Sequence, residues 1–179
     1  MKRSFKIALA GNPNCGKTTV FNLLTGTHQH VGNYSGVTVE RKTGVCRMGD
    51  IKIEVIDLPG IYSLSSATAE ERVAFTELME GNIDLILNIV DSGNIQRNLY
   101  LTTQLAELNI PMVLVFNMID EARNRGMNFN IPILERFFGA PIVEAAGATG
   151  EGIGELKRLL LQKLEAANPE PPHPIDFGS

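Results

Sequence analysis

The chain has no tryptophan, only two cysteines and no apolar stretch of the length that a membrane span needs. Cys15 and Cys46 are too few for a disulfide framework, which favours a reducing, cytosolic setting. The first residues do not have the pattern of a secretory signal peptide. These absences argue against a small secreted scaffold and against a chain that itself forms a transport channel.

A strong excess of one charge is also missing, since 16 Lys and Arg residues face 20 Asp and Glu residues, for a net charge of −4. This balance argues against a surface that coats nucleic acid, although it leaves a ribosome contact open. The length of 179 residues is enough for one domain with a substantial core.

Apolar runs typical of strands alternate with helix-like segments. The strand-like ranges are 6–10, 40–46, 51–57, 83–90, 111–117 and 141–144, and the helix-like ranges are 17–25, 69–80, 95–108, 131–138 and 153–166. Alternation of this kind predicts an α/β fold, with a mostly parallel sheet of six or seven strands and helices on both faces. The segment 40–57 would add an antiparallel hairpin at one edge.

The C-terminal end has a different composition. Proline recurs at positions 169, 171, 172 and 174, which excludes a helix and is typical of a linker. We therefore expect one domain over 1–168 and a Pro-rich linker or tail over 169–179.

Residues 11–18, Gly-Asn-Pro-Asn-Cys-Gly-Lys-Thr, fit the phosphate-binding loop G-x-x-x-x-G-K-[ST]. An apolar strand precedes the loop and a helix-like run follows it. Gly11 and Gly16 allow a tight turn whose backbone N–H groups point at a phosphate. Lys17 would reach the β- and γ-phosphates, and the Thr18 hydroxyl would bind Mg²⁺. The alternative is a glycine-rich turn that binds nothing.

Asp57-Leu58-Pro59-Gly60 follows an alternating strand, 51–57. A carboxylate at the end of a strand beside a phosphate loop can hold Mg²⁺ through water, and the Gly60 N–H can sense a γ-phosphate. The alternative is an ordinary turn.

Asn117-Met118-Ile119-Asp120 follows another buried strand, in the place where GTPases keep their guanine-reading motif. The Asp120 carboxylate can accept hydrogen bonds from the guanine N1–H and 2-amino group, which adenine does not offer. The alternative is an acid in the first turn of a helix.

Between the first two motifs, residues 30–40 have little periodic pattern and predict a switch loop. Thr38 is its candidate second hydroxyl ligand for Mg²⁺, bound only when a γ-phosphate is present. The alternative is a threonine at the edge of a strand.

Taken together, the motifs resemble those of the cytosolic G domain of the ferrous iron transport protein B family. The resemblance covers residues 5–166. It rests on Gly11-Asn12-Pro13-Asn14, Val31-Gly32-Asn33, Gly36-Val37-Thr38-Val39-Glu40, Asp57-Leu58-Pro59-Gly60-Ile61-Tyr62-Ser63-Leu64 and Asn117-Met118-Ile119-Asp120. Family members usually carry tryptophan and proline where this chain has Tyr34 and Ser35.

The resemblance implies a Ras-like P-loop GTPase that binds and hydrolyses GTP with Mg²⁺ and K⁺. It would regulate a bacterial Fe(II) transporter from the cytoplasmic face of the inner membrane, with the membrane domain in the same polypeptide. The implied nucleotide contacts are Gly11, Asn12, Pro13, Asn14, Cys15, Gly16, Lys17, Thr18, Thr19, Gly36, Val37, Thr38, Asp57, Gly60, Asn117, Met118, Asp120, Ala146, Gly147 and Ala148. The implied catalytic group is Lys17, Asn14, Thr38 and Gly60.

Many small GTPases place a glutamine after D-x-x-G to orient water, but this chain has Ile61. The resemblance implies that Asn14 and the carbonyls of Gly32 and Tyr34 instead hold K⁺ against the phosphates. Slow intrinsic hydrolysis is then expected.

The second base-contacting loop also departs from the family, because Ala146-Gly147 stands where Ser-Ala is common. The Gly147 N–H would contact guanine O6. Without the serine hydroxyl the loop is expected to be loose, which predicts fast GDP release.

Other polar residues carry weaker expectations. His28 and His30 are weak evidence for a metal, and Asp91 and Asn94 are expected to cap the following helix. Glu70 and Glu71 are expected to lie in solvent at the start of a helix, with a partner contact in the second switch region as the alternative. Two alternative functions stay open: a nucleotide-gated binding module with negligible turnover, and a ribosome-assembly GTPase, although no basic RNA-binding domain or other nucleic-acid partner is indicated. The sequence also leaves open whether the chain forms a homo-oligomer.

Overall fold

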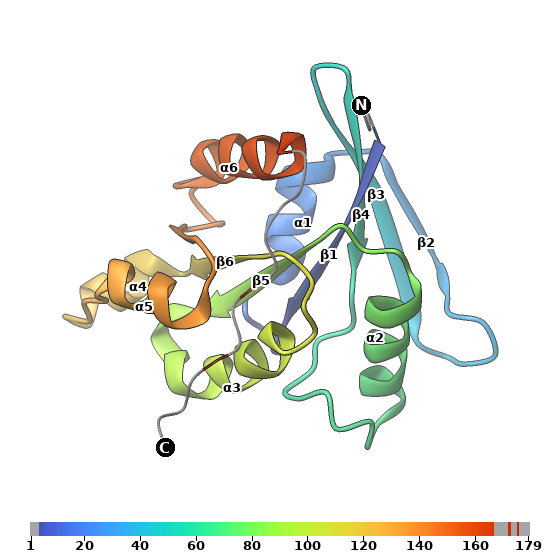
Figure 1. Ribbon diagram of the computed structural model, residues 1–179, viewed down its shortest axis with the longest axis horizontal. Helices are drawn as coiled ribbons and strands as arrows, with labels where there is room; N and C mark the ends of the chain where they lie inside the picture. Colours follow the sequence, from blue (N-terminus) through green and yellow to red (C-terminus); the bar gives the residue numbers. More distant parts are fainter. Residues whose placement is uncertain (1–3, 167–171, 173–174, 176–179) are drawn as a thin grey trace.

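The computed structural model describes residues 4–166 together with Pro172 and Ile175, and within them the strands form one mixed sheet (Figure 1). The strand order is β2-β3-β4-β1-β5-β6-β7. The strands are β1 Ser4–Gly11, β2 Gln29–Asn33, β3 Glu40–Met48, β4 Ile51–Asp57, β5 Leu85–Asp91, β6 Met112–Asn117 and β7 Ile142–Glu144. The ladders from β4 through β7 are parallel, whereas β2–β3 and β3–β4 are antiparallel. The predicted parallel sheet with an antiparallel edge is therefore confirmed.

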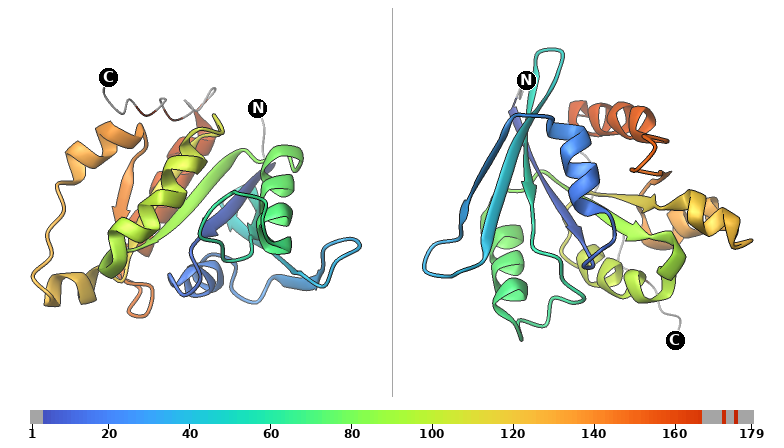
Figure 2. Two further views of the ribbon diagram at one scale, coloured as in Figure 1. Left: turned by 90° about the horizontal axis from the view of Figure 1, so that it is seen from below. Right: turned by 180° about the vertical axis from the view of Figure 1, so that it is seen from behind.

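The helices cover both faces of the sheet (Figure 2). They are α1 Lys17–Thr25, α2 Ala69–Glu80, α3 Ile95–Ala106, α4 Ile119–Asn124, α5 Ile131–Phe138 and α6 Ile153–Glu165, with a short 3₁₀ turn, η1, at Ser92–Asn94. Helices α1 and α6 pack on one face, and α2, α3 and α5 pack on the other. The apolar stripe of α6 is core, as its helical spacing predicts.

The central strand β1 shows why a continuous apolar run was needed. Ile7 and Leu9 enter the core under α1 and α6, while Ala8 and Ala10 enter the core under α2 and α3. A parallel strand that is covered on both faces has no solvent side, so successive residues are all apolar.

Two elements differ from the sequence-based expectation. The expected loop over 30–40 begins as the strand β2, whose residues pair with β3 from Gln29↔Gly44 to Asn33↔Glu40. Backbone hydrogen bonds hold this edge strand, and its side chains are largely exposed, so it has no alternating burial pattern. Helix α4 has only six residues, too short to give a helical period in the sequence.

The chain ends differently from the helix prediction as well, since α6 stops at Glu165. The predicted linker over 169–179 lies outside the described residues except for Pro172 and Ile175. Both of these are buried, and Ile175 packs with the core under α3 and α5. The domain boundary near 168 stays a prediction.

The parallel strands end at one edge of the sheet, which places the motifs together. Leu9 pairs with Asp57, Gly11 with Ile89, and Asp91 with Asn117 at the ends of adjacent strands. Open α/β sheets bind ligands in the crevice outside these carboxyl ends.

Candidate functional site

The phosphate loop connects β1 to α1 and turns sharply at Gly16. Gly16 has φ +85° and precedes the first helical residue, and a Cβ there would collide with the side-chain nitrogen of Asn117. The Cys15 N–H donates to the Asn12 carbonyl at 3.3 Å and closes the turn. Only glycine fits this position, because both the backbone angle and the close approach exclude a side chain.

A cavity of about 500 Å³ lies over this loop and the N-terminus of α1. Its lining joins three of the sequence motifs: Asn12, Pro13, Asn14, Gly16, Lys17 and Thr18 from the phosphate loop, Gly60, and Met118. Unpaired N–H groups at a helix N-terminus and the helix dipole favour an anion. The tertiary structure therefore assembles a site with the character of a phosphate-binding pocket.

The unpaired side-chain amide of Asn12 is the most specific indication that a ligand binds in this cavity. Its side chain is 4% exposed, lines the cavity, and has neither its Nδ2 nor its Oδ1 in a hydrogen bond. A buried amide without partners is costly, and native proteins rarely leave one unsatisfied. A ligand with polar atoms in this cavity would supply those partners, and the motif pattern alone does not single out Asn12.

A second cavity of about 310 Å³ lies on the other side of Lys17. It is lined by Lys17, Thr38, Val39, Glu40, Lys42, Asp57, Leu58, Pro59 and Glu70. Asp57 and Thr38 supply oxygen atoms of the kind that Mg²⁺ prefers. The donor set therefore fits a magnesium ion, with Thr18 in the adjoining cavity as the third oxygen donor.

Lys17 and Asp57 form a direct ion pair between these cavities. The Lys17 Nζ donates to Asp57 Oδ1, and the two side chains are only 10% and 8% exposed. The sequence assigned the lysine to phosphate and the aspartate to metal, and it gave no sign that the two side chains meet. A phosphate oxygen and a cation can replace each partner of this pair.

Gly60 brings the second motif against the phosphate loop. A Cβ at Gly60 would lie 3.0 Å from the Pro13 Cα, and the next N–H, from Ile61, donates to the Gly11 carbonyl at 3.1 Å. Any side chain at Gly60 would push the two segments apart. The Ile61 side chain is 3% exposed and belongs to the core, so it takes no part in the cavity.

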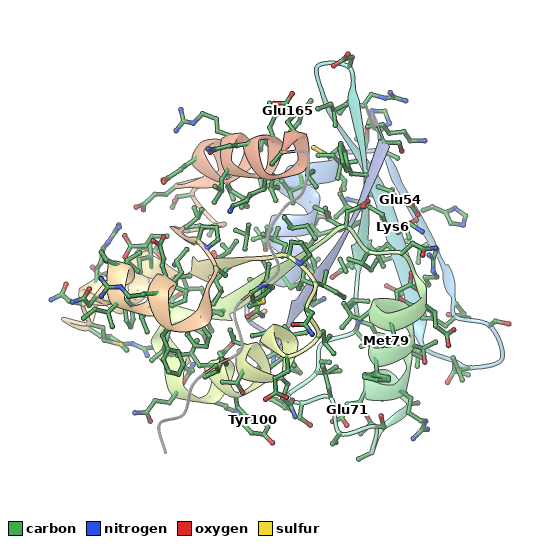
Figure 3. The ribbon with its side chains drawn as sticks, viewed as in Figure 1. Lys6, Glu54, Glu71, Met79, Tyr100 and Glu165 are labelled. Atoms are coloured by element: carbon green, nitrogen blue, oxygen red, sulfur yellow. The ribbon has the colours of Figure 1, made fainter. Side chains whose placement is uncertain are left out.

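The segment after Gly60 is tied to the start of α2 by Glu71 (Figure 3). The Glu71 carboxylate accepts hydrogen bonds from Ser65 Oγ at 2.5 Å, the Ala67 N–H at 3.0 Å and Ser63 Oγ at 3.4 Å. These bonds, above all that from Ser65, hold the pKa of Glu71 below its usual range. The expectation that Glu71 lies in solvent was wrong; Glu70 is exposed and lines the cavity beside Asp57.

Asn117 connects the guanine motif to two other segments. It is 2% exposed, and its Nδ2 donates to the Cys15 carbonyl at 3.0 Å while its Oδ1 accepts from the Gly147 N–H at 2.9 Å. Asp120 lies half-buried in the first turn of α4, beyond Met118, whose φ of +57° starts that helix. Among Asn117, Met118 and Asp120, it is Met118 that lines the larger cavity.

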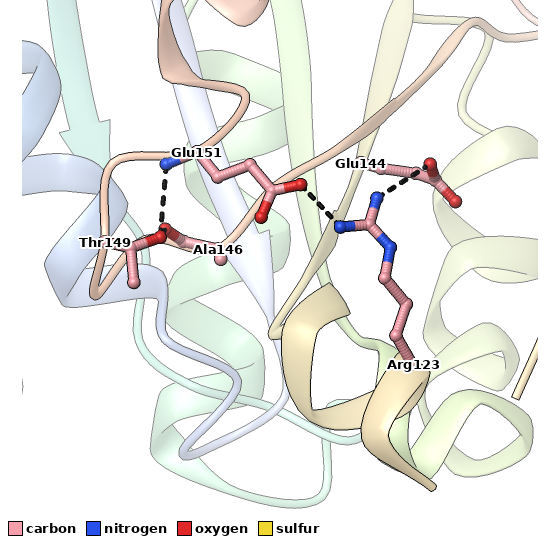
Figure 4. A network of polar contacts seen from close by, with 5 residues as sticks. All are labelled: Arg123, Glu144, Ala146, Thr149 and Glu151. Atoms are coloured by element: carbon pink, nitrogen blue, oxygen red, sulfur yellow. Dashed lines mark hydrogen bonds and ion pairs between the residues drawn. The ribbon is translucent and has the colours of Figure 1, made fainter. Parts of the chain in front are cut away.

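Hydrogen bonds among its own residues and with Glu151 close the base loop, residues 145–150 (Figure 4). The Ala146 N–H donates to the Glu151 carbonyl at 3.0 Å, and the Ala146 carbonyl accepts from the Gly150 N–H at 2.9 Å and from Thr149 Oγ at 3.2 Å. Backbone pairing and the Thr149 hydroxyl thus hold this loop without a serine, and the expected fast release of GDP stays a prediction. The Gly147 N–H, which was expected to contact guanine O6, donates to Asn117 in this structure, so the contact with guanine stays a prediction. Ala148 is exposed at the tip.

The expected K⁺ ligands are not brought together. Asn14 is exposed, has φ +64° and lines the larger cavity, but neither Gly32 nor Tyr34 lines either cavity. Gly32 lies in β2 opposite Arg41, and the Tyr34 carbonyl accepts from the Val37 N–H at 3.3 Å. In this structure the three expected ligands therefore do not line a common cavity.

The switch segment lines the smaller cavity through Thr38, Val39 and Glu40. Gly36 turns the chain with φ +76°, and Gly36, Val37 and Thr38 are all exposed. Thr38 alone of the three lines the cavity with Asp57. At the other end of the phosphate loop, Thr19 is exposed on α1 and lies beside Gly147.

The weaker expectations are settled in part. Asp91 caps the 3₁₀ turn by accepting from the Gly93 N–H at 2.9 Å, but Asn94 donates to Asp91 and does not cap α3. Across residues 4–166, Pro172 and Ile175, no group of three or more His, Cys, Asp and Glu side chains is arranged to hold a metal ion. Over the same residues, no helix combines the length and the apolar character of a membrane span.

Comparison with known proteins gives one consistent result. The family model for ferrous iron transport protein B matches residues 5–160. The chain is 50% identical over 176 residues to an Fe(2+) transport protein A/Fe(2+) transporter FeoB fusion protein of Porphyromonas gingivalis, covering 97% of this chain and 21% of the relative. It is 44% identical over 159 residues to the Fe(2+) transporter FeoB of Escherichia coli K12, covering 87% and 21%. The chain thus spans about a fifth of the length of these curated relatives.

The solved structures extend the likeness to the fold. The cytosolic domain of the T. maritima FeoB iron transporter in a GDP form matches with a TM-score of 0.92 and 39% identity, over 98% of this chain and 69% of that one. The expected Ras-like P-loop GTPase fold is therefore confirmed.

Proposed function

The chain belongs to the ferrous iron transport protein B family, and from this membership we propose that it binds and hydrolyses GTP as the regulatory domain of a bacterial Fe(II) membrane transporter. The observation that carries the proposal is the convergence of three motifs on one cavity, whose wall holds the unpaired Asn12 amide. A nucleotide's phosphates fit a cavity at the N-terminus of α1. The related T. maritima domain in its GDP form supports a guanine nucleotide as the ligand.

Guanine is selected by Asp120. Its carboxylate accepts from the guanine N1–H and 2-amino group, and adenine would leave these hydrogen bonds unmade. Asn117 positions the phosphate loop and the base loop, because both polar atoms of its side chain are already bonded to these two segments.

Phosphate chemistry depends on Lys17 and on the second cavity. Lys17 exchanges its bond to Asp57 for the β- and γ-phosphate oxygens, and the Gly60 N–H donates to the γ-phosphate. Asp57, Thr18 and Thr38 would hold a magnesium ion, which, when bound, neutralises charge that builds up on the phosphate oxygens. Thr38, on the exposed switch segment, would make this contact only while a γ-phosphate is present.

Hydrolysis is slow by itself, since Ile61 is buried where other GTPases use a glutamine to orient water. We expect a rate of roughly 10⁻⁴ to 10⁻² s⁻¹ without a partner. The same observation supports a second candidate, a nucleotide-gated switch with negligible turnover. Stimulation by K⁺ remains part of the proposal because Asn14 lines the cavity, although the carbonyls of Gly32 and Tyr34 lie elsewhere.

The partner that the proposal implies is the remainder of a longer polypeptide with a membrane domain, so that the G domain works at the cytoplasmic face of the inner membrane. Its curated relatives named FeoB are about five times longer than the matched segment. We infer that switch movements report the bound nucleotide to that domain.

Two measurements test the proposal. Calorimetry should show binding of GTP and GDP with ATP weaker by at least ~10³. Single-turnover hydrolysis of GTP with Mg²⁺ then separates the candidates: a measurable rate supports the enzyme, and binding without turnover supports the switch. Equal binding of ATP and GTP would overturn both.

A further inference from the structure

Both ends of the base loop carry a glutamate. Glu144 is the last residue of β7, and Glu151 follows the loop and pairs with Ala146 across it. The two carboxylates therefore flank the segment that faces the base.

Arg123 bridges these two glutamates from α4 (Figure 4). One guanidinium nitrogen donates to Glu151 Oε1 at 2.6 Å, and the other to Glu144 Oε2 at 3.5 Å. Because Arg123 contacts both glutamates, any movement that spreads the two ends of the loop would have to break one of these two contacts. The arginine thus connects the two ends of the loop.

Helix α4 also carries the base-reading carboxylate. Asp120 lies three residues before Arg123, so the two are neighbours along one side of the helix. The first N–H of the helix, from Ile119, donates to the Ala145 carbonyl at 3.0 Å. One short helix therefore holds the base reader and two of the attachments of the base loop, beside the bond from Asn117.

We propose that Arg123 is a positioning residue that holds the base loop closed over guanine and sets the rate of nucleotide release. The proposal rests on the proposed function and adds to it a residue that touches no part of the nucleotide. Asn117 orders the start of the loop from inside the protein, and Arg123 orders its two ends from the surface.

We call Arg123 with its contacts to Glu144 and Glu151 the arginine clamp. The solvent exposure of these side chains determines how strongly the clamp holds the loop. The side chains of Arg123, Glu151 and Glu144 are 48%, 44% and 38% exposed. Exposed ion pairs are weak and are screened by salt. The clamp should therefore slow release by a modest factor that disappears at high ionic strength, and most of the effect should lie in the off-rate.

The test is release of a fluorescent GDP analogue from the purified chain, followed in stopped flow. Arg123→Gln should release about two- to fivefold faster than the parent protein, with the association rate changed by less than about twofold. In the parent protein, release should accelerate between 0.05 and 0.5 M salt, whereas release from Arg123→Gln should hardly change. Arg47→Gln, at an exposed arginine on β3, is the matched control.

A charge exchange excludes a merely structural role. Arg123→Glu should release faster still, because it places three carboxylates together, and combining it with Glu151→Arg should restore slow release. Thermal unfolding of each variant, measured in parallel, shows whether the fold itself has changed.

Three results would overturn the clamp: unchanged release in Arg123→Gln, an equal change in Arg47→Gln, or no recovery in the charge exchange. In these cases the parent protein still binds GDP, so the proposed function stands. A parent protein that binds neither GDP nor GTP would overturn both proposals.

Discussion

The site has two regions that differ in burial: the base side, formed by Asn117, Asp120 and the base loop, and the switch side, formed by residues 30–40. On the base side, Asn117 is 2% exposed and ties the phosphate loop to the base loop through two hydrogen bonds. On the switch side, Gly36, Val37 and Thr38 are exposed beyond the end of an edge strand, and Thr38 is the one of the three that lines the smaller cavity. Regions with few buried contacts unfold locally most readily, and the segments that move on ligand binding usually lie in such regions. Within the proposed function, this contrast assigns nucleotide affinity to the base side and the response to a γ-phosphate to the switch side.

The largest expected effect tests the base side. Asp120→Asn should weaken GTP and GDP by roughly 10²- to 10⁴-fold, because two charge-assisted hydrogen bonds are lost. It should improve binding of xanthosine triphosphate, whose 2-position oxygen accepts from the new amide. Glu121→Gln, the next acid on α4, is the control for a change of charge. Calorimetry with all three nucleotides measures the exchange, and an undiminished GTP affinity would falsify the assignment of Asp120.

The next effect tests the switch side. Thr38→Ala should lower single-turnover hydrolysis by roughly 10- to 100-fold, the usual range for disturbing a metal-binding group. GDP affinity should stay within about twofold, since Thr38 acts only with a γ-phosphate. Thr76→Ala, at an exposed threonine of α2, serves as the control. Loss of GDP binding in Thr38→Ala would show that the two sides are not separate.

A smaller effect is expected from the monovalent cation, and it tests the role of Asn14 in the larger cavity. If K⁺ assists hydrolysis, replacing Na⁺ by K⁺ should raise the rate on the order of tenfold, or about 1.4 kcal/mol of barrier. Asn14→Ala should abolish the difference and keep GDP binding, while Asn128→Ala should behave as the parent protein. Equal rates in the two salts would remove K⁺ from the proposal.

The smallest effect concerns the base loop. The sequence alone predicts that Ser-Ala at positions 146 and 147 would slow GDP release. The structure reduces this expectation to less than about twofold, because the loop is already closed by the Ala146–Glu151 pairing and by Thr149. A Cβ at Gly147 would also meet Thr19 Cγ2 at 3.3 Å, which limits any gain. Stopped-flow release from the double variant, compared with Arg123→Gln, distinguishes the two accounts, and slowing beyond fivefold would favour the sequence-based one.

The amino-acid sequence by itself determined the fold class and the order of the motifs, and it predicted the specificity for guanine. These depend on short-range patterns: the continuous apolar run of β1 marks a strand covered on both faces, and the spacing of residues 11–18 marks a phosphate loop. The sequence alone also predicted slow hydrolysis, because the Ile61 side chain cannot form the hydrogen bonds that orient a water molecule.

Only the tertiary structure decided the partners of the polar groups. Lys17 meets Asp57 across 40 residues of chain, and Arg123 meets Glu151 across 28. The strand β2 forms because its backbone pairs with the edge of β3. The Asn12 amide is recognisable as unpaired only when its surroundings are known. Periodicity reports which side of an element is buried, but the pairing of distant charges and backbone groups depends on how the sheet brings its strand ends together.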